Sequence, residues 1–434
     1  MTTLALIMLL IVILLLVGMP VAYVFGVGAI GFALLTGKSM SYLIPHAFWQ
    51  LGSFTLLSLP LFIIAGALMG ASGISDRLVR FVNAFVGPIR GGLGSVTIVT
   101  CALFGAIAGS GASAIAAIGS IMIPKMVDQG YPRGYATALV GCSSVLALLI
   151  PPSIPMIIFA LTGGLSVAAA FLSTIVPGIV IALIYCLINY IFLRKSDTLH
   201  VEEKISLPER SRVIAKASKE ASWALLMPVI MLGGIYGGIF TPTEAAAVAL
   251  VYTLPVGFLI YRGLNLQSAM TAIIRGAVST GSIIAMIFFL FVMSRVMIME
   301  QVPQQLSDFL IGLSDNKILI LLLINLLLIL IGMLVDDVSG SILASIILLP
   351  VAVDLGVHPI HFAAIVGTNL GLGNITPPCA PLLYMAGSVG QSQFNEYLKP
   401  TLRFICLGHL PVVLAVTFIP ELALFLPKLL MGIE

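Results

Sequence analysis

Charged side chains are scarce in this sequence. Lys, Arg, Asp and Glu make up 9% of the 434 residues, whereas a soluble domain carries roughly 25%. This scarcity excludes an ordinary water-soluble fold. Hydrophobic residues make up 60% of the chain, and apolar runs of about 20 residues, long enough to cross a bilayer, recur along nearly its whole length. The composition therefore predicts an all-α polytopic membrane protein.

Signals for nucleotide or nucleic-acid binding are also missing. The net charge of +3 gives no indication of a nucleic-acid partner. The stretch TGKS, residues 36–39, resembles the end of a phosphate-binding loop, but Phe32 occupies the position of the required first glycine. We therefore expect no ATP binding, so the energy for any work by this protein would come from an ion gradient or from downhill flow.

Signals for catalysis, disulfides or a metal site made by cysteine and histidine are also missing. A membrane hydrolase of the Ser–His type would need a histidine placed to activate a candidate nucleophile such as Ser110 or Ser339. The sequence pattern places none of the five histidines opposite either serine. The sequence therefore predicts no catalysis. The cysteines lie at irregular spacing in apolar segments, which is typical of buried free thiols rather than of disulfides or a metal site: Cys101, Cys142, Cys186, Cys379 and Cys406.

The chain does contain an internal repeat. When the sequence is displaced by 226 residues, residues 123–158 align with residues 349–384 without a gap, and eleven of 36 positions are identical. The pattern P-P-x-x-P ends both ALLIPPSIP (147–155) and GNITPPCAP (373–381). Prolines this dense break a helix, because each removes a backbone donor and clashes with the preceding turn. A duplicated pair of broken membrane helices indicates the binding site of a secondary transporter, although spacing alone leaves open whether the halves are parallel or inverted.

We expect two halves joined by a polar linker. The first repeat covers residues 1–193, with a hairpin at about 101–124 and a broken helix at about 136–160. The second covers residues 221–434, with a hairpin at about 331–353 and a broken helix at about 361–386. The linker, residues 194–220, holds seven of the 20 Lys and Arg residues, so the positive-inside rule places it in the cytoplasm. The N-terminal apolar run has no basic region or cleavage site and is expected to be a first membrane helix.

Each broken helix follows a segment that predicts a re-entrant hairpin. In the first half, thirteen of the 16 residues from 105 to 120 are Gly, Ala or Ser, which permits close backbone contact and a turn at Ser110–Ser113. In the second half, Asp336 and Asp337 stand alone between uncharged arms. Adjacent carboxylates inside a membrane are expensive and mark an ion or proton pathway. A tight helix contact and a surface loop are the alternatives, but the 226-residue offset aligns the two segments with each other.

The residue types at these hairpins and breaks suit Na⁺, whose hydration shell can be replaced by backbone carbonyls, Ser, Thr and Asn oxygens and one carboxylate. Only the second predicted site contains a carboxylate, so the two sites should not be chemically equal. The first predicted sodium site consists of Ser110, Gly111, Ser113, Gly141, Ser143 and Ser144. The second consists of Asp337, Ser339, Gly340, Gly367, Asn369, Asn374 and Thr376.

Half-helix N-termini at the same places suit an organic anion, because they offer free N–H groups and positive dipole ends. The features together predict a Na⁺-coupled carrier of an organic anion, with Na⁺ as the only metal and no other cofactor. A channel could share such hairpins but needs a continuous pore. The predicted substrate cavity is lined by Ser110, Pro151, Pro152, Ser153, Asn374, Pro377 and Pro378.

Two other charged residues have structural interpretations. Thr241 and Glu244, with Pro242 between them, have the spacing of a capping box, so Glu244 is expected to cap a membrane helix rather than carry protons. Arg295 is expected to reach the membrane interface beside Glu300, with attraction of the anion as the alternative.

Six segments resemble the large membrane subunit of the TRAP (tripartite ATP-independent periplasmic) transporters, and the resemblance covers the whole chain. The hairpins and broken helices are also similar to those of the wider ion-transporter superfamily. The segments are GMPVAYVFGVG (18–28), SLPLFIIAGALM (58–69), FGAIAGSGASAIAAIGSIMIP (104–124), IPPSIPMIIF (150–159), GIFTPTEAAAVA (238–249) and GLGNITPPCAPLLY (371–384).

This resemblance implies inverted repeats, Na⁺ coupling, and a scaffold with a transport domain that moves like an elevator. It implies a multi-pass protein of the bacterial inner membrane with two protein partners, a small four-helix membrane subunit and a periplasmic substrate-binding protein. The expected function is import of an organic carboxylate such as a C4-dicarboxylate or sialic acid. The alternative is a stand-alone Na⁺/dicarboxylate symporter of the same superfamily.

Overall fold

The computed structural model describes residues 2–37, 41–86, 89–194, 199, 207–314 and 316–433. Parts of the TGKS stretch and of the predicted linker lie outside these ranges. The described chain is helical and contains no strand. Eight of its helices are long and apolar enough to cross a membrane, or nine if the bent pair Arg133–Leu149 and Ile154–Thr162 forms one span. This confirms the predicted all-α polytopic membrane protein. All five cysteines are free.

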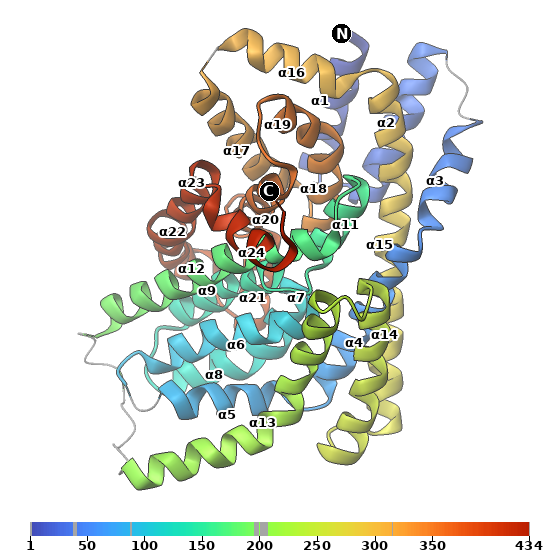
Figure 1. Cartoon of the computed structure of the whole chain (residues 1–434). Helices are drawn as coiled ribbons and strands as arrows, with labels where there is room; N and C mark the ends of the chain where they lie inside the picture. The colour runs from blue at the N-terminus through green and yellow to red at the C-terminus, as the bar shows by residue number, and fades with distance from the viewer. Residues whose placement is uncertain are drawn as a thin grey trace.

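One group of helices forms a wall along one side of the molecule, and α13 extends from it across the bottom of the view (Figure 1). The long helix α15 packs along α2, α3 and α4, and α14 packs against α4 and α13. The wall consists of α1 (Thr2–Leu16), α2 (Val21–Thr36), α3 (Leu43–Leu51), η1 (Phe54–Leu57), α4 (Ser58–Ala71), α13 (Leu207–Tyr236), α14 (Pro242–Pro255), the π-helical η3 (Val256–Ile260) and α15 (Leu266–Met299).

The start of α14 shows why its sequence forms a helix there. Thr241 Oγ1 accepts a hydrogen bond from the N–H of Glu244 at 3.3 Å, and Glu244 Oε2 accepts one from the N–H of Thr241 at 2.8 Å. The two side chains thus satisfy two of the free N–H groups of the first turn. The predicted capping box is confirmed.

The remaining helices form an inner group. Its part from the first half consists of α5 (Ile74–Val86), α6 (Gly92–Ala108), α7 (Gly111–Ala114), η2 (Ile115–Gly119), α8 (Ser120–Asp128), α9 (Arg133–Ser144), α10 (Leu146–Leu149), α11 (Ile154–Thr162) and α12 (Val167–Leu193). Its part from the second half consists of α16 (Val302–Leu313), α17 (Lys317–Leu334), α18 (Asp337–Leu343), η4 (Ala344–Leu348), α19 (Leu349–Asp354), α20 (Pro359–Gly373), α21 (Pro381–Gly390), α22 (Phe394–Phe404), η5 (Ile405–His409), α23 (Leu410–Phe418) and α24 (Glu421–Met431).

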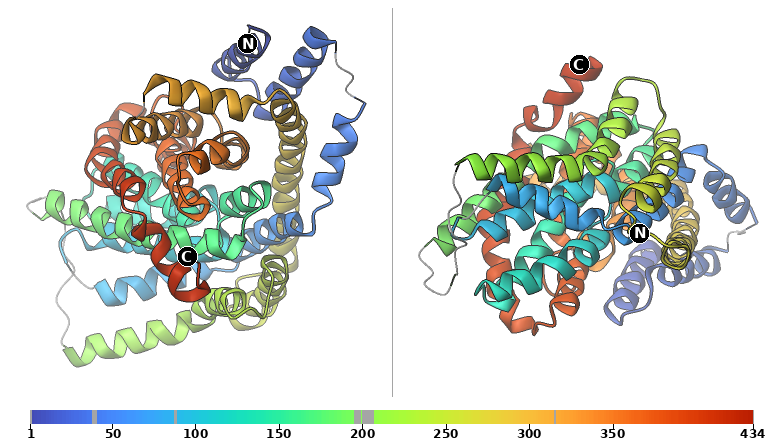
Figure 2. Two further views of the ribbon diagram at one scale, coloured as in Figure 1. Left: turned by 45° about the horizontal axis from the view of Figure 1, so that its top comes forward. Right: turned by 90° about the horizontal axis from the view of Figure 1, so that it is seen from below.

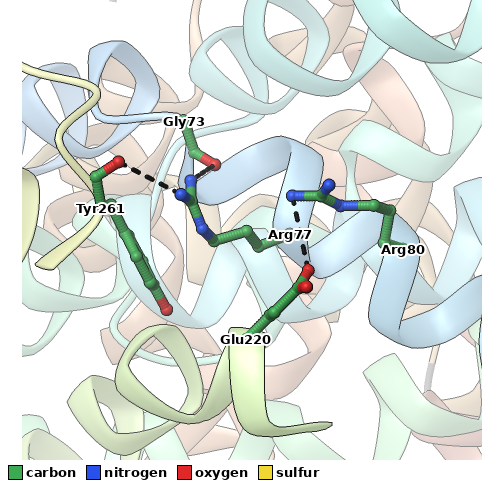
Figure 3. A network of polar contacts seen from close by, with 5 residues as sticks. All are labelled: Gly73, Arg77, Arg80, Glu220 and Tyr261. Carbon is green, nitrogen blue, oxygen red and sulfur yellow. Dashed lines mark hydrogen bonds and ion pairs between the residues drawn. The ribbon is translucent and has the colours of Figure 1, made fainter. Parts of the chain in front are cut away.

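The amphipathic helix α5 connects the wall to the inner group, because it packs against α13 on one side and α6 on the other. A polar network fastens it (Figure 3). The Arg77 guanidinium donates to the carbonyls of Gly73 at 2.9 Å and Tyr261 at 3.2 Å, and it lies 3.9 Å from the centre of the Tyr261 ring. Arg80 forms an ion pair of 3.8 Å with Glu220 of α13. The end of the wall and the start of the inner group are therefore held together at this helix.

Part of the predicted linker is helical in the structure. Residues 207–220, which the sequence assigns to a polar connector, belong to α13 and continue into its apolar part. Ala217, Ala221 and Ala224 are buried, and their spacing of four and three residues is that of one helix face. The many charged residues on the other faces of this segment conceal the helical period in the sequence.

Small residues allow close contacts around the first hairpin. A Cβ atom on Gly105 would lie 2.4 Å from Cα of Ala147, and one on Gly66 would lie 3.2 Å from Cα of Ala108. Helix α6 therefore touches α10 on one side and the wall helix α4 on the other, with no room for a larger side chain. Residues 105–109 of the small-residue segment are buried, as the sequence predicts, whereas Ala116 and Ser120 are exposed.

The two halves of the inner group are interlocked (Figure 2). The first arm of each broken helix packs against its own hairpin, α9 against α6 and α8, and α20 against α17 and α18. The second arm packs against the hairpin of the other half, α11 against α18 and η4, and α21 against η2 and α8. The inner helices thus share one core rather than forming two separate domains.

Candidate ion and substrate sites at the helix breaks

The first hairpin turns at Gly109 and Ser110. Gly109 has φ +62°, a left-handed conformation that glycine adopts without strain. Ser110 then caps α7, because its Oγ accepts a hydrogen bond from the N–H of Ser113 at 3.5 Å. The turn lies at the beginning of the predicted tip.

The first helix break lies between Leu149, which ends α10, and Ile154, which begins α11. The peptide bond between Pro151 and Pro152 is cis, and the arms on the two sides of the break are bent by 41°. Both prolines and Ser153 are buried. In this conformation the first break is therefore covered by protein.

Hydroxyl groups bind two carbonyls that this break frees from the helix. Ser153 Oγ donates to the carbonyl oxygen of Leu148 at 2.5 Å, and Thr174 Oγ1, from α12, donates to that of Leu149 at 2.7 Å. These hydrogen bonds offset the cost of leaving buried carbonyls unpaired. Protein hydroxyl groups therefore pair these two carbonyls of the first break without an ion.

The first hairpin tip touches the first break directly. The N–H of Ile154 donates to the carbonyl of Gly109 at 3.3 Å. A Cβ on Gly109 would lie 2.4 Å from the carbonyl oxygen of Pro152, and one on Gly111 would lie 3.2 Å from that of Ser144. The structure therefore brings the predicted residues Gly111 and Ser144 together with the turn.

The other residues of the first predicted sodium site lie on α9. Ser144 Oγ donates to the carbonyl of Gly141 at 2.7 Å. Ser143 is fully buried, and its Oγ has no hydrogen-bond partner in the described part of the chain. The Cβ side of Gly141 faces α21, where Leu383 Cδ1 would be 3.2 Å away, so this glycine also permits close helix packing.

The second hairpin turns at Asp336, which caps α18. Its carboxylate accepts hydrogen bonds from the N–H groups of Val338 at 3.1 Å and Ser339 at 3.4 Å, and from the Ser339 hydroxyl. Ser339 Oγ also lies 3.0 Å from Met286 Sδ of α15, so this tip touches the wall. The sequence marks both aspartates but does not distinguish the capping role of Asp336.

Asp337, the predicted sodium ligand, is the first residue of α18. Its backbone carbonyl accepts a hydrogen bond from Ser341 Oγ at 2.7 Å. Its carboxylate is partly buried and makes no hydrogen bond to another side chain among the described residues. Of the two adjacent carboxylates, only that of Asp336 is bound by a side-chain hydroxyl, so that of Asp337 is the candidate cation ligand.

The second break, residues 374–380, contains a cis Pro–Pro bond like the first but is longer and more open. The peptide bond between Pro377 and Pro378 is cis. Pro377 is partly buried and Pro378 is exposed, whereas the matching Pro151 and Pro152 are buried; Thr376 and its match Ile150 are both partly buried. In this conformation the second break is the one that reaches the surface of the chain.

Carbonyls of the second break also have partners within the protein. Thr376 Oγ1 donates to the carbonyl of Leu372 at 2.6 Å, and the N–H of Leu382 donates to the carbonyl of Asn374 at 3.2 Å. A hydroxyl that donates to a carbonyl keeps lone pairs that can bind a cation. Thr376 therefore remains a candidate ligand, with its orientation fixed by Leu372.

Half of the unpaired buried polar atoms in the described chain lie near the two breaks. Within the described residues, six buried side-chain N or O atoms have no hydrogen-bond partner, and three belong to predicted site residues: Ser143 Oγ, Asn369 Oδ1 and Asn374 Nδ2. Leaving a buried polar group unpaired costs about 1–3 kcal/mol. Such atoms indicate places where an ion, substrate or water completes the structure.

Two predicted ligands of the second site have packing roles. A Cβ on Gly340 would lie 2.7 Å from Leu370 Cδ2, so this glycine allows α18 to approach α20. The Cβ side of Gly367 faces Thr174 Cγ2 at 3.3 Å and Leu149 Cδ2 at 3.4 Å. Gly367 therefore lies beside the first broken helix. These contacts are not with the second hairpin, where the other predicted ligands Asp337, Ser339 and Gly340 lie.

The structure adds polar residues near the breaks that the sequence analysis does not select. Thr174 binds the first break, while Asn325 and Thr417 form hydrogen bonds near the second. The sequence alone could have singled out Asn325, because it is the one polar residue in the apolar run from 318 to 331. Thr174 and Thr417 lie in long helices where no sequence pattern distinguishes them.

Membrane helices with two hairpins that meet two broken helices define a secondary transporter. Residues 7–422 match the family model "Tripartite ATP-independent periplasmic transporter, DctM component". The chain belongs to this family, as the large membrane subunit of a TRAP transporter, and is a multi-pass protein of the bacterial inner membrane rather than an enzyme. The resemblance seen in the sequence is confirmed.

Similar proteins support this assignment. The isethionate TRAP transporter permease protein DctMQ of Oleidesulfovibrio alaskensis is 35% identical over 413 residues, which cover 95% of this chain and 64% of that protein. The sialic acid TRAP transporter large permease protein SiaM of Vibrio cholerae is 34% identical over 422 residues, covering 96% of this chain and 97% of that one. The solved structure of the YdaH transporter of Alcanivorax borkumensis has a TM-score of 0.63 at 13% identity, covers 88% of this chain and 89% of its own, and supports the fold alone.

Proposed function

We propose that this TRAP large permease couples the inward movement of Na⁺ to the import of an organic carboxylate. The observation that carries the proposal is the set of unpaired buried atoms at the breaks. The oxygens of Ser143 and Asn369, with the carboxylate of Asp337, suit a hard cation. The N–H donor of Asn374 and the nearby helix N-termini suit an anion.

The substrate class follows from chemistry that the relatives share. Proteins 33–35% identical to this chain are named for isethionate, sialic acid, C4-dicarboxylates and ectoine. All four compounds contain a carboxylate or sulfonate group. Since the identities are nearly equal, they do not select among the four, and we propose a carboxylate such as a C4-dicarboxylate or sialic acid.

Two protein partners complete the proposed transporter. The family is tripartite by its description, and the chain spans only 64% of the relative DctMQ, which leaves room there for a second membrane subunit. We propose a small four-helix membrane subunit and a periplasmic substrate-binding protein that delivers the carboxylate.

The proposed transport cycle moves the inner group against the wall as an elevator, with the two halves as inverted repeats. In support, the order hairpin, cis-proline break and long helix occurs in both halves, and the wall helices other than α13, which packs mostly against α5, pack mainly against one another. The predicted repeats, 1–193 and 221–434, remain the proposed boundaries.

The test is uptake by proteoliposomes that contain this chain and its small subunit. Radiolabelled carboxylates are offered with and without an inward Na⁺ gradient, and with and without the binding protein. We expect uptake only when both are present. Uptake that needs Na⁺ but no binding protein would support a stand-alone symporter, and uptake indifferent to both would contradict the proposal.

A further inference from the structure

A chain of buried polar side chains joins three helices of the inner group. Asn325 of α17, Asn369 of α20 and Thr417 of α23 are 4%, 0% and 2% exposed. Thr417 Oγ1 shares its single hydrogen between the carbonyl of Val413 at 2.8 Å and Asn325 Oδ1 at 3.1 Å, and Asn369 Nδ2 donates to the same Asn325 oxygen. The oxygen of Asn325 thus receives two hydrogen bonds from two other helices.

The hydrogen bonds fix which way both amides point. Asn325 Nδ2 donates to the carbonyl of Leu321 at 2.9 Å, and Asn369 Nδ2 donates to that of Ile365 at 2.8 Å. Turning either amide around would place its oxygen against an oxygen acceptor. Because both N–H bonds of Asn369 are directed at acceptors, its oxygen must face the other way.

That oxygen is left without a partner. Asn369 Oδ1 is buried and has no hydrogen bond within the described chain. Asn369 lies four residues before Gly373, where α20 ends and the second break begins. A buried acceptor with a fixed direction, next to a broken helix, has the chemistry of a cation ligand.

We infer that Asn325 and Thr417 are positioning residues, which hold the Asn369 amide with its oxygen directed at the coupling cation. Neither residue touches the cation. Outer partners of this kind determine ligand orientation, and their loss typically weakens metal binding by 10–100-fold. The inference rests on the proposed Na⁺ coupling and adds two residues of α17 and α23 to the machinery of the second site.

The principal test is Asn325→Leu, which removes the shared acceptor and keeps a side chain of similar size. The Asn369 amide is then free to turn. We expect the Na⁺ concentration for half-maximal uptake to rise roughly tenfold in proteoliposomes holding the full complex. A second readout is the stabilisation of the purified complex against heat by NaCl, relative to choline chloride, which should require correspondingly more salt.

The matched control is Asn189→Leu. Asn189 is also fully buried, and its amide donates to the carbonyl of Gly91 at 2.7 Å and accepts from Tyr135 Oη at 3.2 Å. Its loss removes a comparable buried amide from α12, so the unfolding temperature should fall. The Na⁺ concentration for half-maximal uptake should stay at the wild-type value.

Threonine variants keep the inference testable if Asn325→Leu fails to fold. Thr417 and Thr253 are both buried and donate to the carbonyl four residues earlier, at 2.8 Å and 2.7 Å, but only Thr417 also reaches Asn325. Thr417→Val should raise the required Na⁺ concentration several-fold, Thr417→Ser should restore it, and Thr253→Val should leave it unchanged.

Two outcomes separate the inference from the proposed function. In the first outcome, wild-type uptake depends on Na⁺, but the Na⁺ concentration for half-maximal uptake shifts no more in Asn325→Leu or Thr417→Val than in the matched control. This result would overturn the positioning role alone. Wild-type uptake and stability that ignore Na⁺ would overturn the proposed coupling and this inference with it.

Discussion

At the residue scale, the adjacent aspartates of the second hairpin have different surroundings. Asp336 is committed to the first turn of α18 by three hydrogen bonds, whereas the carboxylate of Asp337 is not bound to another described side chain. Substitutions should therefore separate helix capping from cation binding.

Asp336→Ala should lower stability by about 1 kcal/mol, the usual cost of losing an N-cap. Asp336→Asn should cost little, because asparagine caps helices as well as aspartate does. The measurement is thermal unfolding of the purified protein in detergent. Equal unfolding temperatures for Asp336→Ala and wild type would show that the cap contributes nothing.

Asp337→Asn should leave the unfolding temperature near the wild-type value and raise the Na⁺ concentration needed for uptake. The expected change is roughly tenfold, since a hydrogen bond or contact to a charged group contributes about 1.5–3 kcal/mol. The measurement is Na⁺-dependent uptake in proteoliposomes. Unchanged Na⁺ dependence would mean that the predicted second sodium site is wrong.

His358 makes the start of α20 sensitive to pH. Its Nδ1 accepts the N–H of Ile360 at 3.1 Å, which only the neutral ring can do. Burial, and secondarily Lys428, lower the pKa of His358 below its ordinary 6.5. Because the folded pKa lies below the unfolded one, the cap stabilises fully above about pH 6.5 and is lost as the pH falls through the folded pKa.

The expected result is a steeper fall of unfolding temperature between about pH 7 and about pH 5 in wild type than in His358→Asn, whose amide caps without titrating. Parallel curves for the two proteins would contradict a role for this histidine.

At the scale of elements, the turns and breaks could be predicted from the sequence and their partners could not. Gly109 permits a left-handed turn and the proline pairs restrict their own backbones, so local sequence marks the tip and both breaks. The partners of the freed carbonyls are remote in sequence: Thr174 lies 25 residues from Leu149. Only the packing of α12 against α10 brings them together.

The contact between α6 and α10 should tolerate no side chain at residue 105. In Gly105→Ala the new Cβ would lie 2.4 Å from the Ala147 backbone, and overpacking of this kind typically costs about 1–3 kcal/mol. Gly70→Ala is the control, because nothing lies within 4 Å of its Cβ position. We expect a lower unfolding temperature only for Gly105→Ala, and equal behaviour of both variants would argue against this packing.

At the scale of the whole molecule, interlocking makes the halves depend on each other. The repeat was visible in the sequence because prolines and glycines mark equivalent positions. The packing of each second arm, α11 or α21, against the hairpin of the other half could not be seen in the sequence. Apolar helix surfaces of similar composition do not specify which partner they cover. Neither half contains a complete set of contacts for its own broken helix.

Dividing the chain between α12 and α13 should therefore give two pieces that fold only together. Without the second piece, α11 loses α18 and η4, and without the first, α21 loses η2, α8 and α9. We expect each piece alone to aggregate in detergent and the co-expressed pieces to elute as one monodisperse species by size exclusion. A monodisperse N-terminal piece alone would contradict this dependence.

The contact between Ser339 and Met286 has a consequence for depth in the bilayer. Residues 276–294 of α15 carry no charge and lie between Arg275 and Arg295. At about 1.5 Å per residue they span about 28 Å, close to the hydrocarbon thickness of about 30 Å. Met286 stands near their middle, so the Ser339 hydroxyl, 3.0 Å from its sulfur, lies near the midplane. Cargo held at that tip, as we propose, would have about 15 Å of hydrocarbon thickness on either side, so each transport cycle would have to open a water-filled path, or displace the tip, over half of the membrane.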